Sequence, residues 1–245
     1  MGATQAPNTG RILDYWLGGD HHFSADAEAA TAFSALFDGF PEVFATLRRF
    51  IGRAARAAAE EGVAQFLVLG SGIPAQGNVH EAVPGARVLY TDIDPANIEL
   101  GKAILRNTPD TDYTYCDAAD LGSLDRRVAA MTLDLSERLA IVMVGVSVFL
   151  DDDTVRKTLA DCYDLAPEGS VLVADFDGEA LESHPEVLRI LDEGGEPLHL
   201  RRPERIRALL GPWALSDDGI RPVDAWRATP AGAGPTFMYG CMARK

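Results

Sequence analysis

The chain has 245 residues, of which 47% are apolar and 24% charged, and its formal net charge is −15. This length fits one α/β domain with an appendage and is enough to bury a large core. Because nucleic-acid binding needs a basic surface that displaces counterions, the strong negative charge argues against DNA or RNA as a partner.

Targeting signals and cysteine usage point to a cytoplasmic protein. Residues 1–10 lack the basic start and apolar segment of a signal peptide. The longest apolar run, residues 139–150, is too short to cross a bilayer and predicts a buried central strand. Cys116, Cys162 and Cys241 fit neither a disulfide framework nor a zinc site. We therefore expect no membrane partner and no metal.

The first 60 or so residues are predicted to be helical. Residues 25–37 carry Ala and Phe at helical spacing, and residues 41–60 place one apolar face along a longer helix. Gly62 ends this pattern. We predict a helical N-terminal cap over residues 1–62 and one compact Rossmann-like domain over residues 63–245.

After the cap, apolar runs alternate with helical segments. The predicted strands are residues 65–69, 87–92, 113–116, 139–148 and 170–176, with a late pair at 213–216 and 236–243. The predicted helices lie near residues 95–106, 120–131, 154–165, 179–191 and 203–210. Such alternation implies parallel strands joined by right-handed crossovers. Five parallel strands closed by a late pair predict an α/β class I methyltransferase fold, with a doubly wound seven-stranded sheet.

One segment has the spacing of a nucleoside site. Residues 66–74, Phe-Leu-Val-Leu-Gly-Ser-Gly-Ile-Pro, form an apolar run that leads into a glycine turn, and Asp92 ends the next run about 20 residues later. Glycines allow close approach of the backbone to a ligand, and the later acid accepts hydrogen bonds from ribose hydroxyls. Gly70, Gly72 and Gly77 do not make the G-x-G-x-x-G of a dinucleotide fold, which argues against a dehydrogenase.

Several blocks in order resemble one protein family. They are Arg11-Ile12-Leu13-Asp14-Tyr15-Trp16-Leu17-Gly18-Gly19, Phe23-Ser24-Ala25-Asp26, Arg53-Ala54-Ala55-Arg56, Gln65-Phe66-Leu67, Gly70-x-Gly72-Ile73-Pro74, Asn78-Val79-His80-Glu81, Ala86-Arg87-Val88-x-Tyr90 and Asp92-x-Asp94-Pro95. Together the matches span residues 10–153. The sequence is similar to an actinobacterial S-adenosylmethionine (SAM) methyltransferase-like family, formerly a domain of unknown function.

This resemblance implies a SAM site over the carboxyl ends of the first four strands. Asp92 would accept from the ribose hydroxyls, Asp117 would lie near the adenine amino group, and residues 145–147 would line the methionine side. The implied cofactor-binding residues are Gly70, Ser71, Gly72, Asp92, Ile93, Asp117, Gly145, Val146 and Ser147. The helical cap would close over this active site, with Tyr15, Gly18 and Gly19 near the ligand.

The sequence departs from the family around the methionine and acceptor pocket. Val68 stands where the family usually carries an acid, and Leu47 and Val148 stand where an Asn and a His are common. Asp20-His21-His22 replaces Lys-Asp-Asn before Phe23.

The candidate catalytic residues come from this changed segment and its neighbour: His21, His22, Tyr15 and Asp20. Adjacent histidines on an extended segment point opposite ways and do not share a metal well. One of them could act as a general base, because the ordinary pKa of histidine suits neutral pH. The equal alternative is one packed and one solvated ring. Asp94 and Asp151 precede helices and are predicted to cap them.

The leading hypothesis is an enzyme of secondary metabolism, a SAM-dependent methyltransferase acting on a natural-product or amino-acid-like small molecule. A cyclase that releases methylthioadenosine from SAM, by attack of its own amine or α-carbon on the γ-carbon, is the first alternative. Its product would be azetidine-2-carboxylate or 1-aminocyclopropane-1-carboxylate. A non-catalytic SAM-binding protein is the second. A homodimer is compatible with the sequence.

Overall fold

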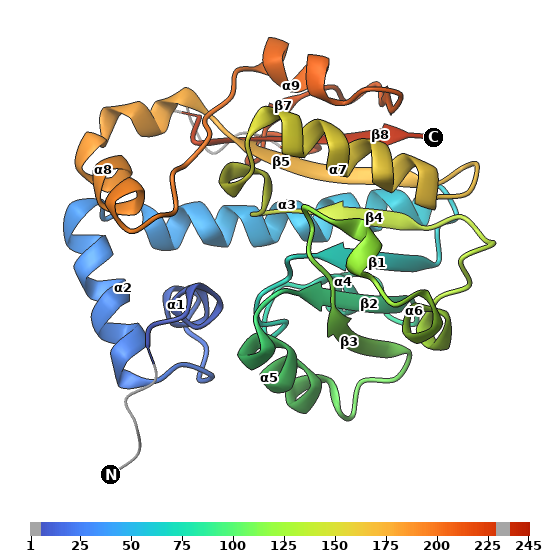
Figure 1. Ribbon diagram of the computed structural model, residues 1–245, viewed down its shortest axis with the longest axis horizontal. Helices are drawn as coiled ribbons and strands as arrows, with labels where there is room; N and C mark the ends of the chain where they lie inside the picture. The colour runs from blue at the N-terminus through green and yellow to red at the C-terminus, as the bar shows by residue number, and fades with distance from the viewer. Residues whose placement is uncertain (1–5, 229–235) are drawn as a thin grey trace.

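The computed structural model describes residues 6–228 and 236–245. Within them, one mixed sheet of eight strands forms the centre of the molecule (Figure 1). Its strands are β1 (Gln65–Leu69), β2 (Arg87–Asp92), β3 (Thr111–Tyr115), β4 (Ala140–Met143), β5 (Val171–Asp177), β6 (Ala214–Leu215), β7 (Arg221–Pro222) and β8 (Met238–Arg244).

The strand order is β3-β2-β1-β4-β5-β8-β6, and β7 pairs with β8. Strands β1 to β5 are parallel to one another, and β8 runs antiparallel to β5. The class I methyltransferase fold class is therefore confirmed. The two-residue strand β7 was not predicted from the sequence, and the strand predicted over residues 139–148 is longer than β4. Gly145, with φ +76°, turns the chain just after Met143, and residues 147–149 form a 3-10 turn.

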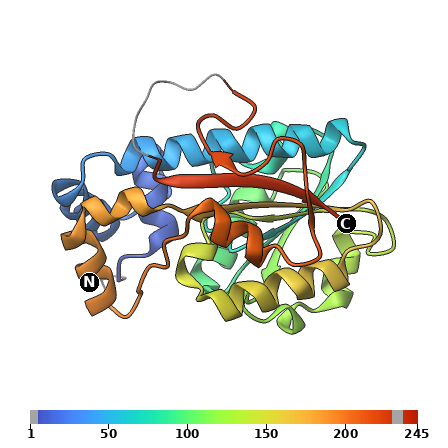
Figure 2. The same ribbon diagram turned by 90° about the horizontal axis from the view of Figure 1, so that it is seen from above.

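Helices cover both faces of this sheet, and several lie at its carboxyl edge. They are α1 (Thr9–Trp16), α2 (Ser24–Leu36), α3 (Phe40–Glu60), α4 (Val79–Ala82), α5 (Pro95–Leu105), α6 (Arg126–Thr132), α7 (Asp152–Leu165), α8 (Pro185–Glu193) and α9 (Pro203–Leu209). Figure 2 shows α3 on one face, and α7 and α9 on the other. No helix of the residues described is both long enough and apolar enough to cross a membrane.

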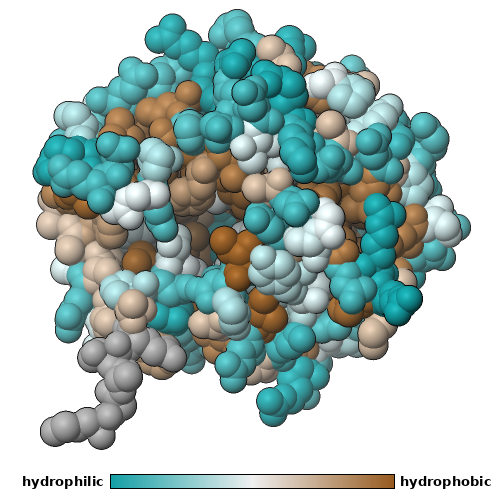
Figure 3. Space-filling model, in the orientation of Figure 1, coloured by the Kyte–Doolittle hydropathy of each residue, from teal (hydrophilic) through white to brown (hydrophobic). Residues whose placement is uncertain are grey.

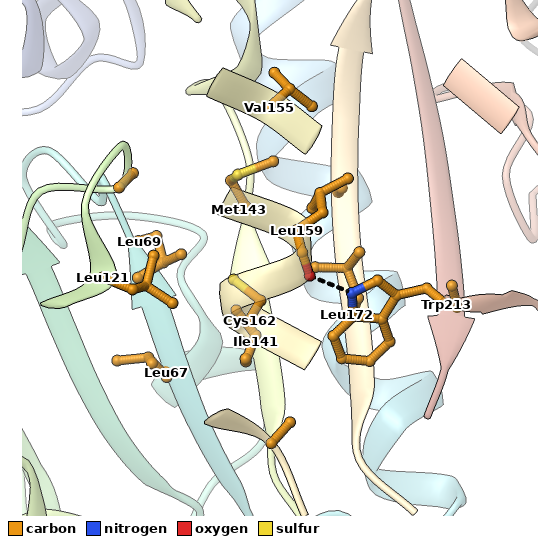
Figure 4. Close-up of a cluster of buried hydrophobic side chains, with 14 of the residues drawn as sticks. Leu67, Leu69, Leu121, Ile141, Met143, Val155, Leu159, Cys162, Leu172 and Trp213 are labelled. Atoms are coloured by element: carbon orange, nitrogen blue, oxygen red, sulfur yellow. Dashed lines mark hydrogen bonds between the residues drawn. The ribbon is translucent and has the colours of Figure 1, made fainter. Parts of the chain in front are cut away.

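Each face of the sheet has its own apolar core. On one face Phe50 and Ala54 of α3 pack with Phe66 and Val88 of the sheet. The other core joins α7 and α9 to the opposite side of β1, β4 and β5 (Figure 4). There, Trp213 donates its indole N–H to the carbonyl of Leu159, at 2.8 Å, so that the buried ring leaves no polar atom without a partner.

The helices α1 and α2 stand beside the carboxyl ends of the parallel strands (Figure 1). Ligands of open α/β sheets bind outside these ends, where the strand order reverses. Here the order reverses between β1 and β4, which are hydrogen-bonded neighbours. In Figure 3 the surface is hollowed near the centre of the molecule, at the level where α1 and α3 approach the sheet in Figure 1.

Candidate functional site

The turn after β1 has a backbone that glycine alone adopts easily. Gly70 and Gly72 have φ +57° and +60°. A Cβ at Gly70 would lie 2.4 Å from Val146 Cγ2, so this position also needs glycine for space. At Gly72 the nearest atom to such a Cβ is Gly10 Cα, at 3.6 Å. The glycine turn therefore lies between the loop after β4 and the first turn of α1.

Ser71 holds this turn from inside. Its N–H donates to the Thr91 carbonyl at 2.8 Å, and its hydroxyl donates to the Tyr113 hydroxyl, also at 2.8 Å. The Tyr113 hydroxyl in turn donates to the Gly72 carbonyl at 2.6 Å. Burial, helped by the nearby Asp92 charge, raises the pKa of Tyr113, so its hydroxyl keeps its proton. Because the Ser71 side chain is committed to these bonds, it stabilises the turn from beneath.

Asp92, the last residue of β2, connects the turn to α5. Its carboxylate accepts from the N–H groups of Gly72 and Asp94, both at 2.9 Å, and from Asn97 Nδ2 at 3.4 Å. A carboxylate offers about four acceptor positions, so capacity for a ligand hydroxyl remains. Beside it, Asn97 Oδ1 is buried and has no hydrogen-bond partner among the residues described. Two oxygen acceptors thus lie next to the glycine turn.

Large apolar side chains are exposed along the same edge. Ile93 is 58% exposed directly after Asp92, and Tyr115 is 48% exposed at the position that pairs with Asp92 in the sheet. Asp117, two residues further, is half-buried, and its Oδ1 accepts from Ala119 N at 2.8 Å. Exposed apolar surface next to oriented acceptors is the composition of a site for a flat, partly apolar ligand.

The loop after β4 completes this edge. Gly145 donates its N–H to Asp175 Oδ1 at 2.7 Å, and the Ser147 hydroxyl donates to the Asp175 carbonyl, also at 2.7 Å. The Ser147 side chain is therefore turned into the protein. Val146 is half-buried and packs over Gly70.

A buried ion pair holds the cap segment together. Arg11 Nε donates to Asp26 Oδ2 at 2.7 Å, and both side chains are almost fully buried. The Asp26 carboxylate also accepts from the N–H groups of Asn8 and Phe23, each at 2.9 Å. Burial acts to raise the pKa of Asp26, but these hydrogen bonds outweigh it, and the pKa is lowered.

Helix α1 contacts the glycine turn and α5 directly. Asn8 caps α1 by accepting from Arg11 N, and its side-chain amide donates to Asp94, which caps α5. A Cβ at Gly10 would lie 3.0 Å from Asn97 Oδ1. The cap is therefore joined to the same residues that surround Asp92.

Asp14 of α1 is the centre of a small acid–imidazole cluster. This carboxylate is buried, accepts from His21 N at 2.8 Å, and has its Oδ2 3.2 Å from His22 Nδ1. His21 Nδ1 lies 3.7 Å from Asp14 Oδ1 and 3.1 Å from Asp20 Oδ1. The expectation that the two rings point opposite ways is wrong: both are directed to Asp14. Residues 21–23 have no regular secondary structure, and Gly18, with φ +75°, lies in the turn that precedes them.

Comparisons with known proteins identify the family of this chain. The model of a family described as S-adenosyl methyltransferase matches residues 3–245. The chain belongs to this family. Among curated proteins, none matches.

Two solved structures cover almost the whole methyltransferase chain. A DUF574 family protein from Streptomyces avermitilis MA-4680 is 30% identical, with a TM-score of 0.85, over 99% of this chain and 98% of its own. A candidate methyltransferase from Thermobifida fusca YX is 29% identical, with a TM-score of 0.87, over 99% and 96%. Magnesium protoporphyrin IX methyltransferase from Synechocystis PCC 6803, at 12% identity and a TM-score of 0.56 over 96% and 92%, shares the fold alone.

The residues at the glycine turn fit the nucleoside of SAM. Asp92 and the unpartnered Asn97 Oδ1 would be the acceptors for two ribose hydroxyls, and Ile93 would provide an apolar surface for the adenine ring. On the side of α1, a Cβ at Gly72 would lie 3.6 Å from Gly10 Cα, so α1 packs closely against the turn. In residues 6–228 and 236–245, no group of three or more His, Cys, Asp or Glu side chains is placed to hold a metal.

Arg48, a residue of α3, lies beside the loop that follows the glycine turn. Arg48 donates to Asn78 Oδ1 at 2.7 Å and packs against Gly77, which follows the glycine turn. Burial lowers the pKa of Arg48, while the charge of Asp14 is among the influences that oppose this shift. In the part of the chain that the structure describes, no carboxylate lies within 4.0 Å of this guanidinium.

Most of the predicted residues lie at one edge of the sheet, but several of their side chains do not have the orientation that the sequence predicted. The predicted cofactor residues lie in the turn after β1, at the ends of β2 and β3, and after β4, with the Ser71 and Ser147 side chains turned inward. Tyr15 is 38% exposed and its ring meets that of His22 edge-on at 5.0 Å, whereas the Asp20 side chain is 93% exposed. Sequence reasoning missed Asn97, Arg48 and Asp14. For Asn97, the one available signal was its position in the first turn of a helix, five residues after Asp92.

Proposed function

We propose that this family member transfers the methyl group of SAM to a small-molecule acceptor, a natural product or amino-acid-like compound. The observation that carries the proposal is the pair of oxygen acceptors, Asp92 and Asn97 Oδ1, beside the left-handed glycine turn. These atoms suit the two hydroxyls of a ribose. The exposed side chain of Tyr15, whose ring meets that of His22 edge-on, adds apolar surface for an acceptor.

When bound, SAM supplies a methyl group that its sulfonium already activates. The chain then has to align the acceptor and accept its proton. We propose His22 as the base, oriented by Asp14 through the 3.2 Å contact to its Nδ1. A carboxylate behind an imidazole fixes its tautomer and stabilises the protonated ring. Tyr15, His21 and Asp20 are the neighbouring candidates.

We propose that Arg48 binds the carboxylate of the methionine portion. Its guanidinium lies next to the loop that continues from the glycine turn, and Asn78 orients it. Val68, on β1, is apolar and only 7% exposed, so β1 contributes no acid at this position. An arginine that makes no ion pair with the described residues can form a bidentate bond with a carboxylate.

The decisive experiment is mass spectrometry of the nucleosides formed from SAM, with the protein alone and with a panel of small amines, phenols and amino acids. We expect S-adenosylhomocysteine (SAH), and only when an acceptor is present. Accumulation of methylthioadenosine from SAM alone, above the background without enzyme, would show that the protein catalyses cyclisation rather than methyl transfer. Binding of SAM with no product under any condition would leave a non-catalytic protein.

The His22→Gln variant tests the base. Because general base catalysis contributes about 10²–10⁴-fold, we expect kcat/KM to fall by about 100-fold while SAH affinity stays unchanged. The pH–rate profile should also lose its acidic limb, since that limb reports the protonation of the base. His199→Gln removes a half-buried imidazole outside the cluster and serves as the control. An unchanged pH profile in His22→Gln would exclude this histidine.

A further inference from the structure

Two acidic side chains lie on one face of β5, near its carboxyl end. Asp175 is fully buried, and its Oδ1 accepts from Gly145 N at 2.7 Å. Its Oδ2 is buried with no hydrogen-bond partner in the described part of the chain. Asp177, two residues later, is half-buried. Because a buried carboxylate oxygen without a partner is costly, its retention points to a ligand that supplies one.

No side chain of the described residues forms an ion pair with either acid. Arg201 is the nearby cation, and its backbone N–H donates to the Asp177 carbonyl at 2.7 Å. Its guanidinium, however, is bound to the Asp152 carboxylate and to the carbonyls of Ser147 and Leu150. Residues 1–5 and 229–235, which the structure does not describe, contain no Lys or Arg.

The acid pair is directed to the α3 side of the sheet. Asp175 pairs with Gly240 of the antiparallel strand β8, and directly paired residues share a face. A Cβ at Gly240 would lie 2.6 Å from the ring of Phe50, which belongs to α3. Val173, two residues before Asp175, lies in the same α3-side core.

Half-buried aromatic rings lie on the α3 side of the sheet, and one of them is next to this end of β5. Phe44 of α3 and Phe237 pack against the α3-side core, and the Phe237 carbonyl accepts from Gly178 N at 2.7 Å, next to Asp177. The ring of Phe37 lies 5.1 Å from that of Phe237 and 4.3 Å from that of His184. The faces of aromatic rings attract cations electrostatically, so they add to the attraction of the acids.

The acid pair is also adjacent to the expected methyl donor. Asp175 is bonded to Gly145, in the loop after β4. Val146, the next residue, packs over Gly70 of the glycine turn, and Leu47 of α3 lies 3.8 Å from the Cβ position of Gly145. The path from the glycine turn to the acids therefore crosses a single loop.

We propose that Asp175 and Asp177 bind a cationic nitrogen of the acceptor, so that the substrates of this enzyme are amines whose apolar body lies against Phe37, Phe44 and Phe237. This inference rests on the proposed function, because it names the acceptor class of the same site. Burial raises the pKa of Asp175 to about 7, and burial together with the Asp175 charge raises that of Asp177. An ammonium ion would offset this cost by favouring the ionised carboxylates.

The test compares 2-phenylethylamine with its neutral counterpart 2-phenylethanol. Calorimetry with the whole protein, with and without saturating SAH, should show the amine binding at least ten-fold more tightly. Asp175→Asn keeps an acceptor for Gly145 N but removes the charge, and it should bring the two affinities within two-fold. Asp177→Asn, at a half-buried position, should act in the same direction and serves if Asp175→Asn does not fold. Glu182→Gln removes an exposed charge of η3 (Glu179–Ser183) and should change nothing.

Equal affinity for the amine and the alcohol in the wild-type protein, or an amine preference that survives both Asn variants, would overturn the inference. Failure of the two proposals is distinguishable. If SAH binds and the amine preference is absent, the acceptor class is wrong and the methyl-donor site stands. If SAH does not bind, the proposed function fails whatever the result with the amine.

Discussion

Asp92→Ala is expected to lower the affinity for SAH by about 100-fold or more. The ribose hydroxyls would lose their charge-assisted hydrogen bonds to the carboxylate, and such bonds contribute about 1.5–3 kcal/mol each. The N–H of Gly72 would also lose its acceptor, so the glycine turn would lose one of the hydrogen bonds that stabilise it. Calorimetric titration with SAH measures both effects together.

Asp92→Asn separates these two effects. The amide oxygen can still accept from one backbone N–H and hold the turn, but it lacks the charge and the second acceptor, so we expect a loss of about ten-fold. Glu99→Ala, on the exposed side of α5, is the matched control and should bind like the wild type. An Asp92→Ala protein whose SAH affinity stays within three-fold of the wild type would remove the ribose role.

Asp26→Ala is expected to release the cap segment. The substitution leaves the Arg11 guanidinium buried without its carboxylate, and it removes the acceptor of the Asn8 and Phe23 N–H groups. Breaking a buried ion pair on one side costs about 3–5 kcal/mol. We therefore expect faster hydrogen exchange across α1 and α2, and a weaker SAH affinity because α1 contacts the glycine turn.

The sign of the pH effect follows from the lowered pKa of Asp26. The stabilisation that it contributes is fully present above the unfolded pKa of 3.8, and it is lost as the pH falls through the lower folded pKa. At neutral pH the variant should thus show the whole effect. Glu28→Ala, exposed on the same helix, is the control. Unchanged exchange of α1 in Asp26→Ala would contradict this role of the ion pair.

The fold could be predicted from the sequence because its signals are local. The strand β1 and the bounds of β2 follow from continuous apolar runs, and Asp94 and Asp151 cap the helices that they precede. β4 was predicted too long, since its apolar run continues through Val148 while the backbone turns at Gly145. β7 consists of two residues and has no pattern of its own.

The candidate site was only partly predictable, because its contacts join distant segments. Composition cannot show that the rings of His21 and His22 both lie beside the Asp14 carboxylate, since this depends on the turn at Gly18. Nor can it show that Arg48 of α3 lies beside the loop after β1. Spacing identified Asp92 because the distance from a glycine turn to the end of the next strand is set by the fold itself.

The measurement that tests the central claim most directly is hydrogen–deuterium exchange of the wild-type protein with and without SAH. We predict that SAH slows exchange at the glycine turn (residues 70–73), from the end of β2 into α5 (residues 92–97), in the loop after β4 (residues 145–147) and in α1. Protection confined to other segments, or no change at saturating SAH, would contradict a cofactor site at the carboxyl ends of these strands.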